Sequence, residues 1–448
     1  MRRVLCLMYH FPPVGGAAVQ RNAKFVRYLP EFGYEPVVLT GPGPGSTNWW
    51  TPRDESLEAD VPANVTVRRL QGSEPASSGR LKAALERRLM LREPAEKWWI
   101  ENAVRERGNG LADVDVVFGS LVPYGSGEAT ARLARALGKP WVVDLQDPWA
   151  LDEMWLYPSE LHRKVDLRRM RNILTAADAV IMNTPEAVTR VRDAFPALES
   201  KLVASIPNGF DAADFRGEAP TRNDGKFRIV HTGYLHTSQG LRLRRTRSVR
   251  KLLGGSAAPV DILPRSHVYL IDAVNQLLAE DPSLHERLEL VFAGVASDAD
   301  REVAERCPVA KMLGYVPHRQ TVELLRSADL VFLPMHDLPD GWRAGLVPGK
   351  TYEYLAAGRP ILAAVPDGDA RDLLAESGIA HLCRPTDVDA MKNIVSDEIA
   401  KARRGEDPPA PRSDVIARYE RRRLTEDLAG VLSSVLGERH RRPTASPR

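Results

Sequence analysis

Cysteine is scarce in this sequence: the three among 448 residues are Cys6, Cys307 and Cys383, and no metal-ligand or disulfide spacing relates them. This scarcity argues against a zinc-finger or disulfide-stabilised scaffold and favours a reducing, cytoplasmic location. Long apolar runs are absent too, since none approaches the ~18 residues of a membrane span. The short run from Val4 to Met8 precedes His10-Phe11-Pro12-Pro13 without a small-residue cleavage site, so we expect a first strand there rather than a signal peptide.

An excess of charge of one sign is also missing. The chain has 62 basic and 59 acidic residues, a net charge of +3. This balance argues against a dedicated nucleic-acid-binding protein. Hydrophobic residues make up 43% and charged residues 27%, as in ordinary globular proteins. The length predicts two domains of roughly 200 residues each.

Short apolar runs alternate with stretches of helical spacing in both halves of the chain. In the first half the predicted strands are 4–8, 35–40, 114–118, 141–145 and 179–182. In the second half they are 227–231, 288–292, 330–333 and 360–364. This alternation predicts an α/β fold with parallel sheets covered on both faces by helices.

The alternation stops in a polar, Gly- and Pro-containing stretch near the middle of the chain. We therefore expect a first Rossmann-like domain at 1–206, a linker at 207–226 and a second domain at 227–414. A helix at 415–438 and a disordered basic tail at 439–448 follow. Residues 236–264 break the pattern of the second domain and predict a mobile insertion, in which the basic residues are Arg242, Arg244, Arg245, Arg247, Arg250 and Lys251.

Adjacent glycines, Gly15 and Gly16, lie between the first predicted strand and the first predicted helix. Glycine lets a backbone approach a ligand closely, and a helix start offers unpaired N–H groups to an anion. The spacing is not that of the Gly-x-Gly-x-x-Gly dinucleotide motif. A tight strand-to-helix turn without a ligand accounts for the glycines equally well.

A second motif, Asp144-Leu145-Gln146-Asp147-Pro148-Trp149, lies at the end of a predicted strand. Open parallel sheets bind ligands at that edge, where a carboxylate can hold a sugar hydroxyl or accept a proton. Asp147 before Pro148 is equally typical of a helix cap.

The third motif runs from Gly345 to Pro360 and is the most informative. Its Pro-Gly turn opens a short helix whose free N–H groups suit a phosphate, and Lys350 adds a positive charge there. Glu353 lies one turn further, where its carboxylate can accept both hydroxyls of a ribose. Gly358 then ends the helix. A solvated Lys350–Glu353 pair is the alternative interpretation.

Taken together and in order, these motifs resemble the family-4 group of retaining glycosyltransferases of the GT-B fold, over nearly the whole chain. The resemblance also includes Ile206-Pro207-Asn208-Gly209, Gly314-Tyr315-Val316-Pro317 and Ala328-Asp329-Leu330. It implies two Rossmann-like domains facing a central cleft, with the C-terminal helix crossing back to the N-terminal domain. It also implies an enzyme that uses a nucleotide-diphosphate sugar as co-substrate.

The resemblance assigns roles to individual residues. Catalysis would involve Asp147, which faces the transferred sugar, together with Arg265 and Lys350, which stabilise the leaving diphosphate. The implied donor-binding residues are Gly15, Gly16, Gly233, Tyr315, Val316, Gly349, Lys350, Thr351 and Glu353. His10 is a candidate for the acceptor site. No Asp-x-Asp triplet stands out as a metal site, so we expect no essential metal ion or other cofactor.

Two departures from the family pattern concern the donor sugar and the diphosphate. Family members often have a glutamate eight residues before the ribose glutamate, and Gly345 occupies that position here. The basic pair expected after the first strand of the second domain is replaced by the basic insertion, and Arg265 is our preferred equivalent over the arginines from Arg242 to Arg250.

The acceptor is left open between a polysaccharide or lipid-linked intermediate and a small secondary metabolite. The segment from Arg80 to Arg92 has the pattern of either a solvated helix or a peripheral contact with an anionic membrane. A sugar-nucleotide epimerase or hydrolase of the same fold is the alternative function, and a non-catalytic nucleotide-sugar-binding protein is a third.

Overall fold

The computed structural model describes residues 1–43, 53–72, 88–90, 92–108, 110–253, 255 and 257–441. The chain forms two compact units. The first comprises Met1–Asp152, Glu160–Asn208 and the chain from Arg421. The second comprises Glu153–Ser159 and Gly209–Glu420. The short segment Glu153–Ser159 therefore folds with the second unit, although first-unit residues flank it on both sides.

The first unit is built on a parallel sheet of seven strands in the order β3-β2-β1-β4-β5-β6-β7. The strands are β1 (Arg2–Leu7), β2 (Tyr34–Thr40), β3 (Thr66–Arg69), β4 (Val116–Ser120), β5 (Trp141–Leu145), β6 (Ala179–Met182) and β7 (Leu202–Ser205). The interior strands are mostly apolar because helices cover both faces of the sheet.

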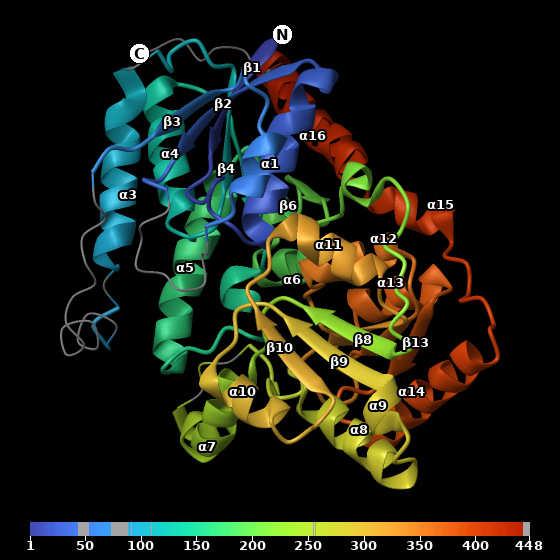
Figure 1. The fold of residues 1–448 in the computed structure, drawn as a ribbon. Helices are drawn as coiled ribbons and strands as arrows, with labels where there is room; N and C mark the ends of the chain where they lie inside the picture. The colour runs from blue at the N-terminus through green and yellow to red at the C-terminus, as the bar shows by residue number, and fades with distance from the viewer. Residues whose placement is uncertain are drawn as a thin grey trace, which may run out of the picture. The chain divides into compact units, whose positions relative to one another are not determined.

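Helices connect these strands. They are α1 (Ala17–Tyr28), α3 (Pro94–Arg105), α4 (Ser126–Leu137), α5 (Glu160–Ala176), α6 (Pro185–Ala194) and α16 (Arg421–Arg441). Short 3-10 turns are η1 (Leu29–Phe32), η2 (Glu55–Asp60), η3 (Glu106–Gly108), η4 (Trp149–Leu151) and η5 (Pro196–Leu198). Figure 1 shows the C-terminal helix α16, in red, beside α1, in blue. Leu424 and Leu428 of α16 share a buried cluster with Phe25 and Val26 of α1, so this helix completes the core of the first unit.

The second unit repeats the plan with six parallel strands in the order β10-β9-β8-β11-β12-β13. They are β8 (Phe227–Thr232), β9 (Leu288–Ala293), β10 (Ala310–Gly314), β11 (Leu330–Pro334), β12 (Ile361–Ala364) and β13 (Ala380–Cys383). The sequence predicted β8, β9, β11 and β12 to within one residue at each end. It did not predict β10, whose residues alternate in burial, or β13, which is largely half-buried.

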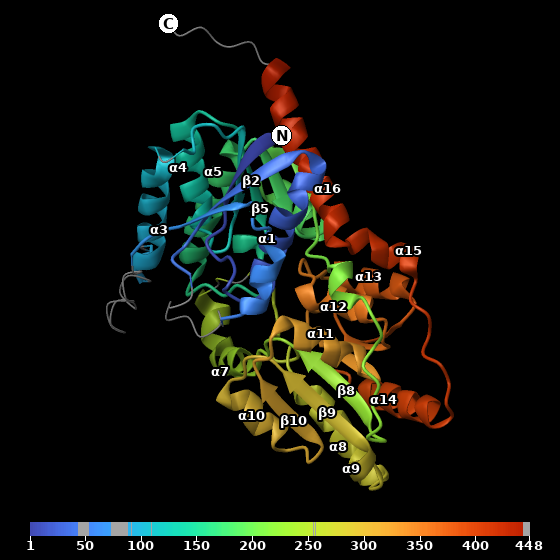
Figure 2. The same cartoon turned by 45° about the horizontal axis from the view of Figure 1, so that its top comes forward.

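The helices of the second unit are α7 (Thr237–Leu253), α8 (Val268–Glu280), α9 (Leu284–Arg287), α10 (Asp298–Ala304), α11 (His318–Arg326), α12 (Gly349–Ala357), α13 (Asp369–Ser377), α14 (Val388–Arg403) and α15 (Ser413–Ile416). The turns η6 (Ala212–Phe215) and η7 (Ala417–Tyr419) complete it. In Figure 2, α14 lies beside α8, and the two share a buried cluster with β8 and β9.

Both sheets have the strand order of a doubly wound Rossmann fold, as the sequence predicted. In each unit, the first strands along the chain are added on one side of the starting strand, and the later strands are added on its other side. This reversal of the strand order lies between β1 and β4 in the first unit and between β8 and β11 in the second. Ligands of such sheets bind at the carboxyl ends of the strands beside the reversal. The fold therefore marks one candidate edge in each unit.

Three predicted segments differ in detail. The predicted mobile insertion at 236–264 instead contains helix α7, which the pattern did not reveal because its arginines leave few apolar residues. The predicted helix at 415–438 is divided into α15, η7 and α16. Of the predicted disordered tail, residues 439–441 continue α16 and residues 442–448 lie outside the described residues. Most of the segment Arg80 to Arg92 also lies outside them. Among the described helices, none is long and apolar enough to span a membrane.

Candidate active site

The carboxyl edge of the second sheet brings together several residues that the sequence singled out. Gly233 follows β8 directly and has a φ of +97°, a conformation that favours glycine. Helix α12 begins at Gly349, after the loop that leaves β11. Lys350 and Glu353 lie in its first turns. The strand-order reversal thus places Gly233 and the start of α12 at the edge where a ligand is expected.

The start of α12 is suited to an anion. Pro348 occupies the N-cap position and no side chain caps the helix. The first N–H groups of a helix carry a partial positive charge. Thr351 is fully buried there, and its Oγ1 has no hydrogen-bond partner within the described residues. Gly358, with a φ of +66°, ends the helix in a left-handed cap.

Lys350 projects its ammonium group into a confined space. Its Nζ lies 3.1 Å from Nε2 of His231. A Cβ added at Gly233 would lie 2.9 Å from the same Nζ, so the lysine side chain lies directly against the end of β8. Burial, followed by the charge of Arg265, lowers the pKa of Lys350 to about 7, and the charge of Glu353 acts in the opposite direction. These three residues therefore belong to one electrostatic cluster.

Arg265 is the arginine that belongs to this cluster. Its main-chain oxygen accepts a hydrogen bond of 3.0 Å from the N–H of His236. Its charge also contributes to the lowered pKa of His231 and of His236, in each case after burial. Arg244, a competitor from α7, is engaged by Asp261, with its NH2 atom 2.6 Å from Oδ2. The structure thus associates Arg265 with Lys350.

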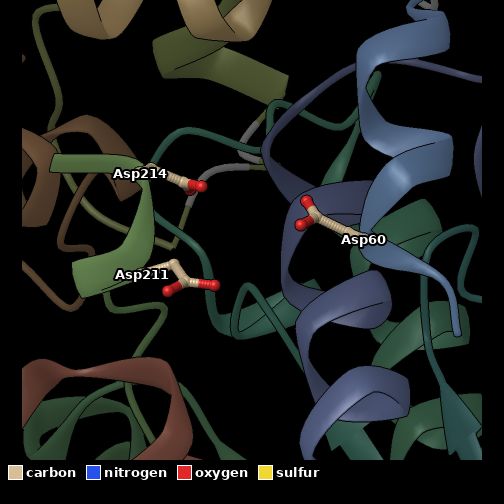
Figure 3. A group of neighbouring side chains, drawn as sticks. All are labelled: Asp60, Asp211 and Asp214. Atoms are coloured by element: carbon tan, nitrogen blue, oxygen red, sulfur yellow. The ribbon is translucent and has the colours of Figure 1, made fainter. Parts of the chain in front are cut away.

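Glu353 is held from the side by a histidine. Its Oε1 lies 3.6 Å from Nδ1 of His318, whose Nε2 lies 3.3 Å from Oδ2 of Asp214. Figure 3 shows Asp214 on η6 and Asp211, whose carboxylate accepts a hydrogen bond from the N–H of Ala213. Asp60, also labelled there, belongs to the first unit and accepts a hydrogen bond of 2.7 Å from Lys24. His318 therefore lies between Glu353 and Asp214, two carboxylates of the second unit.

Tyr315 and Val316 follow β10 at the same edge. Gly314 turns the chain with a φ of +72°. Tyr315 is 39% exposed, and the oxygen of Val316 accepts a hydrogen bond of 3.2 Å from Oγ1 of Thr321. An exposed aromatic ring next to a fixed backbone segment is suited to stacking on a nucleotide base.

In the first unit, Gly16 is the N-cap of α1 with a φ of +116°, and no side chain caps this helix start. Gly15 beside it is buried. His10, three residues after the end of β1, is half-buried, and burial lowers its pKa to about 4. His10 is therefore neutral at physiological pH and can exchange hydrogen bonds with a neutral hydroxyl.

The two aspartates at the end of β5 differ in their surroundings. Asp144 is fully buried in a bidentate pair with Arg21, with bonds of 2.9 Å and 2.8 Å, and so has a structural role. Asp147 is half-buried. Trp149, two residues on, has a φ of +49°, and its ring stacks on Tyr124 at a centroid distance of 4.8 Å. Strained backbone of this kind concentrates at functional sites.

Two family models match the chain. Residues 15–209 match a glycosyl transferase 4-like domain, and residues 262–399 match the glycosyl transferases group 1 model. Together the two matches span most of both units. The chain belongs to the glycosyltransferases of this two-domain family. This confirms the resemblance that the motifs indicated.

Solved structures share the fold at low sequence identity. HepE of Anabaena, in complex with UDP and glucose, is 16% identical with a TM-score of 0.59, and the match covers 97% of this chain and 100% of that one. Sucrose-phosphate synthase of Thermosynechococcus elongatus is 12% identical with a TM-score of 0.59, covering 98% of each chain. MnaA of S. aureus, solved with UDP, is 13% identical with a TM-score of 0.54, covering all of both chains. A comparison with curated proteins finds no match.

Gly345 stands where members of the family often have a glutamate, and in this glycosyltransferase a carboxylate from another part of the chain contacts it. The main-chain N–H of Gly345 donates a hydrogen bond of 3.0 Å to Oε1 of Glu153. The same oxygen lies 3.2 Å from Nε2 of His336, and both side chains are fully buried. A carboxylate from the segment Glu153–Ser159 therefore lies on the backbone of Gly345. Sequence reasoning missed Glu153 and His336 because no spacing relates residues so far apart in the chain.

His231 and His318 were missed as well. In the sequence, His231 is only the last residue of the predicted strand 227–231, and His318 only follows Gly314-Tyr315-Val316-Pro317. A histidine at the carboxyl end of a strand is a signal that would have found His231. His318, the first residue of α11, becomes significant only when the fold brings Glu353 and Asp214 to its two ring nitrogens.

Proposed function

We propose that this glycosyltransferase moves a sugar from a nucleoside-diphosphate sugar to a hydroxyl of its acceptor with retention of anomeric configuration. The observation that carries the proposal is the cluster of Lys350, Arg265 and Glu353 around the uncapped start of α12. A cation and free N–H groups suit a diphosphate, and a carboxylate one turn away suits the two hydroxyls of a ribose.

UDP is the first donor nucleotide to test, because HepE and MnaA were both solved with UDP. In the proposed binding mode, the diphosphate lies at the start of α12 with Lys350 and Arg265. The ribose lies on Glu353, beside His318, and the base lies beside Tyr315 and Val316. Gly233, which has no side chain, leaves space for the sugar phosphate next to Lys350.

The proposed reaction exchanges one bond at the anomeric carbon for another. The bond from this carbon to the diphosphate oxygen breaks while the acceptor oxygen bonds to the same face. The acceptor proton moves to the leaving diphosphate, so no protein nucleophile is needed, unlike in glycosidases that use two carboxylates. Lys350 and Arg265 stabilise the charge that develops on the leaving group.

In the first unit, we assign Asp147 to the transferred sugar, the start of α1 at Gly15 and Gly16 to the donor, and the neutral His10 to the acceptor. Asp147 is preferred to Asp144 because Asp147 is half-buried, whereas Asp144 is fully buried. For the acceptor, both a lipid-linked intermediate and a small molecule remain candidates. Co-sedimentation with vesicles that contain anionic lipid separates them, since a protein that stays in the supernatant favours the small molecule.

The test begins with binding of UDP by calorimetry to the full chain. We expect Lys350→Ala and Glu353→Ala each to raise the Kd about tenfold to hundredfold, because each removes a charge-assisted contact. Glu218→Ala, at an exposed position, serves as the control. Glu353→Ala should also abolish the preference for UDP over its 2′-deoxy analogue. An unchanged affinity in both variants would show that the donor site is wrongly assigned.

Turnover then distinguishes transfer from hydrolysis. A panel of UDP sugars is incubated with and without candidate acceptors, and the released UDP is measured. Transfer predicts release that depends on the acceptor, and product NMR should show the anomeric configuration of the donor. Acceptor-independent release of the free sugar would instead identify a hydrolase, and a product of inverted configuration would contradict the retaining mechanism.

A further inference from the structure

His231 is held through both nitrogens of its ring. It lies near the carboxyl end of β8 and is 1% exposed. Its Nδ1 lies 2.9 Å from the main-chain oxygen of Phe332 on the neighbouring strand β11. A carbonyl oxygen can only accept a hydrogen bond, so Nδ1 carries the proton. Nε2, 3.1 Å from Nζ of Lys350, therefore presents a lone pair to the lysine.

The charges around the pair favour the same assignment. Burial first, and the charge of Lys350 next, hold the pKa of His231 well below its ordinary range. His231 is therefore neutral and can accept a hydrogen bond from an ammonium group. Lys350, with a pKa of about 7, is only partly protonated at neutral pH. An acceptor at its Nζ stabilises the protonated form.

Four titratable or charged groups interact electrostatically with Lys350 or lie beside it. These groups are His231 from β8, His236 from the turn after β8, Arg265 from the turn before α8 and Glu353 from α12 itself. Arg265 disfavours the lysine charge and Glu353 favours it. His231 is the group within hydrogen-bond distance of Nζ.

We propose that His231 is a positioning residue for Lys350, whose Nε2 lone pair holds the ammonium group charged and directed toward the donor diphosphate. The inference rests on the proposed function, because it takes Lys350 to contact that diphosphate. The neighbouring Tyr354 supports the arrangement, since its hydroxyl accepts a hydrogen bond of 2.8 Å from the N–H of Thr232 and fixes the end of β8.

Two substitutions of His231 separate the roles of its two nitrogens. In His231→Asn the amide takes the place of Nδ1, where it can donate to the oxygen of Phe332 but does not reach Lys350. In His231→Gln the amide takes the place of Nε2, where its oxygen can accept from Lys350. The two variants thus form a matched pair of similar polarity, and thermal unfolding of each is recorded in the same buffers.

UDP affinity of the full chain is measured by calorimetry from pH 6 to pH 9. In the unsubstituted protein, affinity should fall as the pH rises through and above about 7, because Lys350 loses its proton. His231→Asn should raise the Kd about tenfold at pH 7.5 and move the fall to lower pH, since the cation loses an acceptor. His231→Gln should stay within about threefold of the unsubstituted protein.

The variant Lys350→Met distinguishes failure of the positioning role of His231 from failure of the proposed donor site. If Lys350→Met abolishes UDP binding while His231→Asn matches the unsubstituted protein at every pH, the positioning role is overturned and the donor site stands. If Lys350→Met binds UDP normally, the donor site itself is wrong. Should the Asn variant fail to fold, NMR of isotope-labelled imidazole in the unsubstituted protein decides, with the His231 signal assigned by its loss in His231→Gln. A proton found on Nε2 between pH 6 and 8 overturns the proposal.

Discussion

Replacing Glu153 by alanine would leave two groups of the second unit without their buried partner. The carboxylate accepts the N–H of Gly345 at 3.0 Å and lies 3.2 Å from Nε2 of His336, and no part of either side chain is exposed to solvent. Leaving a buried donor such as the N–H of Gly345 without its acceptor typically costs about 1–3 kcal/mol, because the group stays desolvated. We therefore expect Glu153→Ala to lower the free energy of unfolding of the second unit by about that amount.

The assay is scanning calorimetry, because a chain of two units need not unfold in one step. For a unit of this size, 1 kcal/mol shifts the midpoint by about 2–4 °C, so the transition of the second unit should fall by about 2–12 °C. The transition of the first unit should stay in place. Glu153→Gln keeps an acceptor for Gly345 and should lose less than half as much. The exposed control Glu218→Ala should change neither transition.

The reasoning would be refuted if Glu153→Ala shifted no transition by as much as ~2 °C, the lower end of the expected range. That result would mean that water or a rearranged side chain replaces the carboxylate at little cost. An equal loss in Glu153→Ala and Glu153→Gln would instead show that the charge of the carboxylate, rather than its hydrogen bond to Gly345, carries the stabilisation.

Three further predictions concern Gly233, Asp144 and Asp147. Gly233→Ala places a Cβ 2.9 Å from Nζ of Lys350 and should raise the Kd for UDP about tenfold in calorimetry; Gly405→Ala, at a φ of +68° in open space, controls for backbone strain alone and should leave the Kd unchanged. Asp144→Asn should destabilise the first unit by about 3–5 kcal/mol in calorimetry, because it breaks the buried pair with Arg21. Asp147→Asn should leave the unfolding midpoint within ~2 °C and lower turnover at least about tenfold, and the opposite pattern would exchange the two roles.

The fold was largely predictable from the sequence because its strands are short, apolar runs at regular intervals, and buried parallel strands have that pattern. The sequence did not predict β3, β7, β10 or β13, because these strands are largely half-buried and their residues are mixed. Helix α7 escaped because its arginines obscure the apolar spacing of a helix. Strands that are buried on both faces are thus the ones that the sequence pattern predicts best.

For the candidate site, the sequence led to residues that share a short motif, such as Lys350 and Glu353 on α12. It did not lead to Glu153 or His336, whose relation depends on where the chain returns to the second unit. Nor did it indicate the role of His231, which depends on the carbonyl oxygen of Phe332 on the neighbouring strand. Spacing along the sequence indicates relations between residues of one motif. Relations between distant residues depend instead on strand pairing and on where the chain returns to a unit.

The inclusion of Glu153–Ser159 in the second unit has a consequence for anyone who wishes to produce the units separately. A fragment that begins at Gly209 would contain His336 and Gly345 but lack the carboxylate that both contact. It would also lack Met154, which packs with Ile262 and Leu346. Such a fragment should be poorly soluble until the missing seven-residue peptide is added or fused to it. Neither unit is therefore a continuous stretch of the gene.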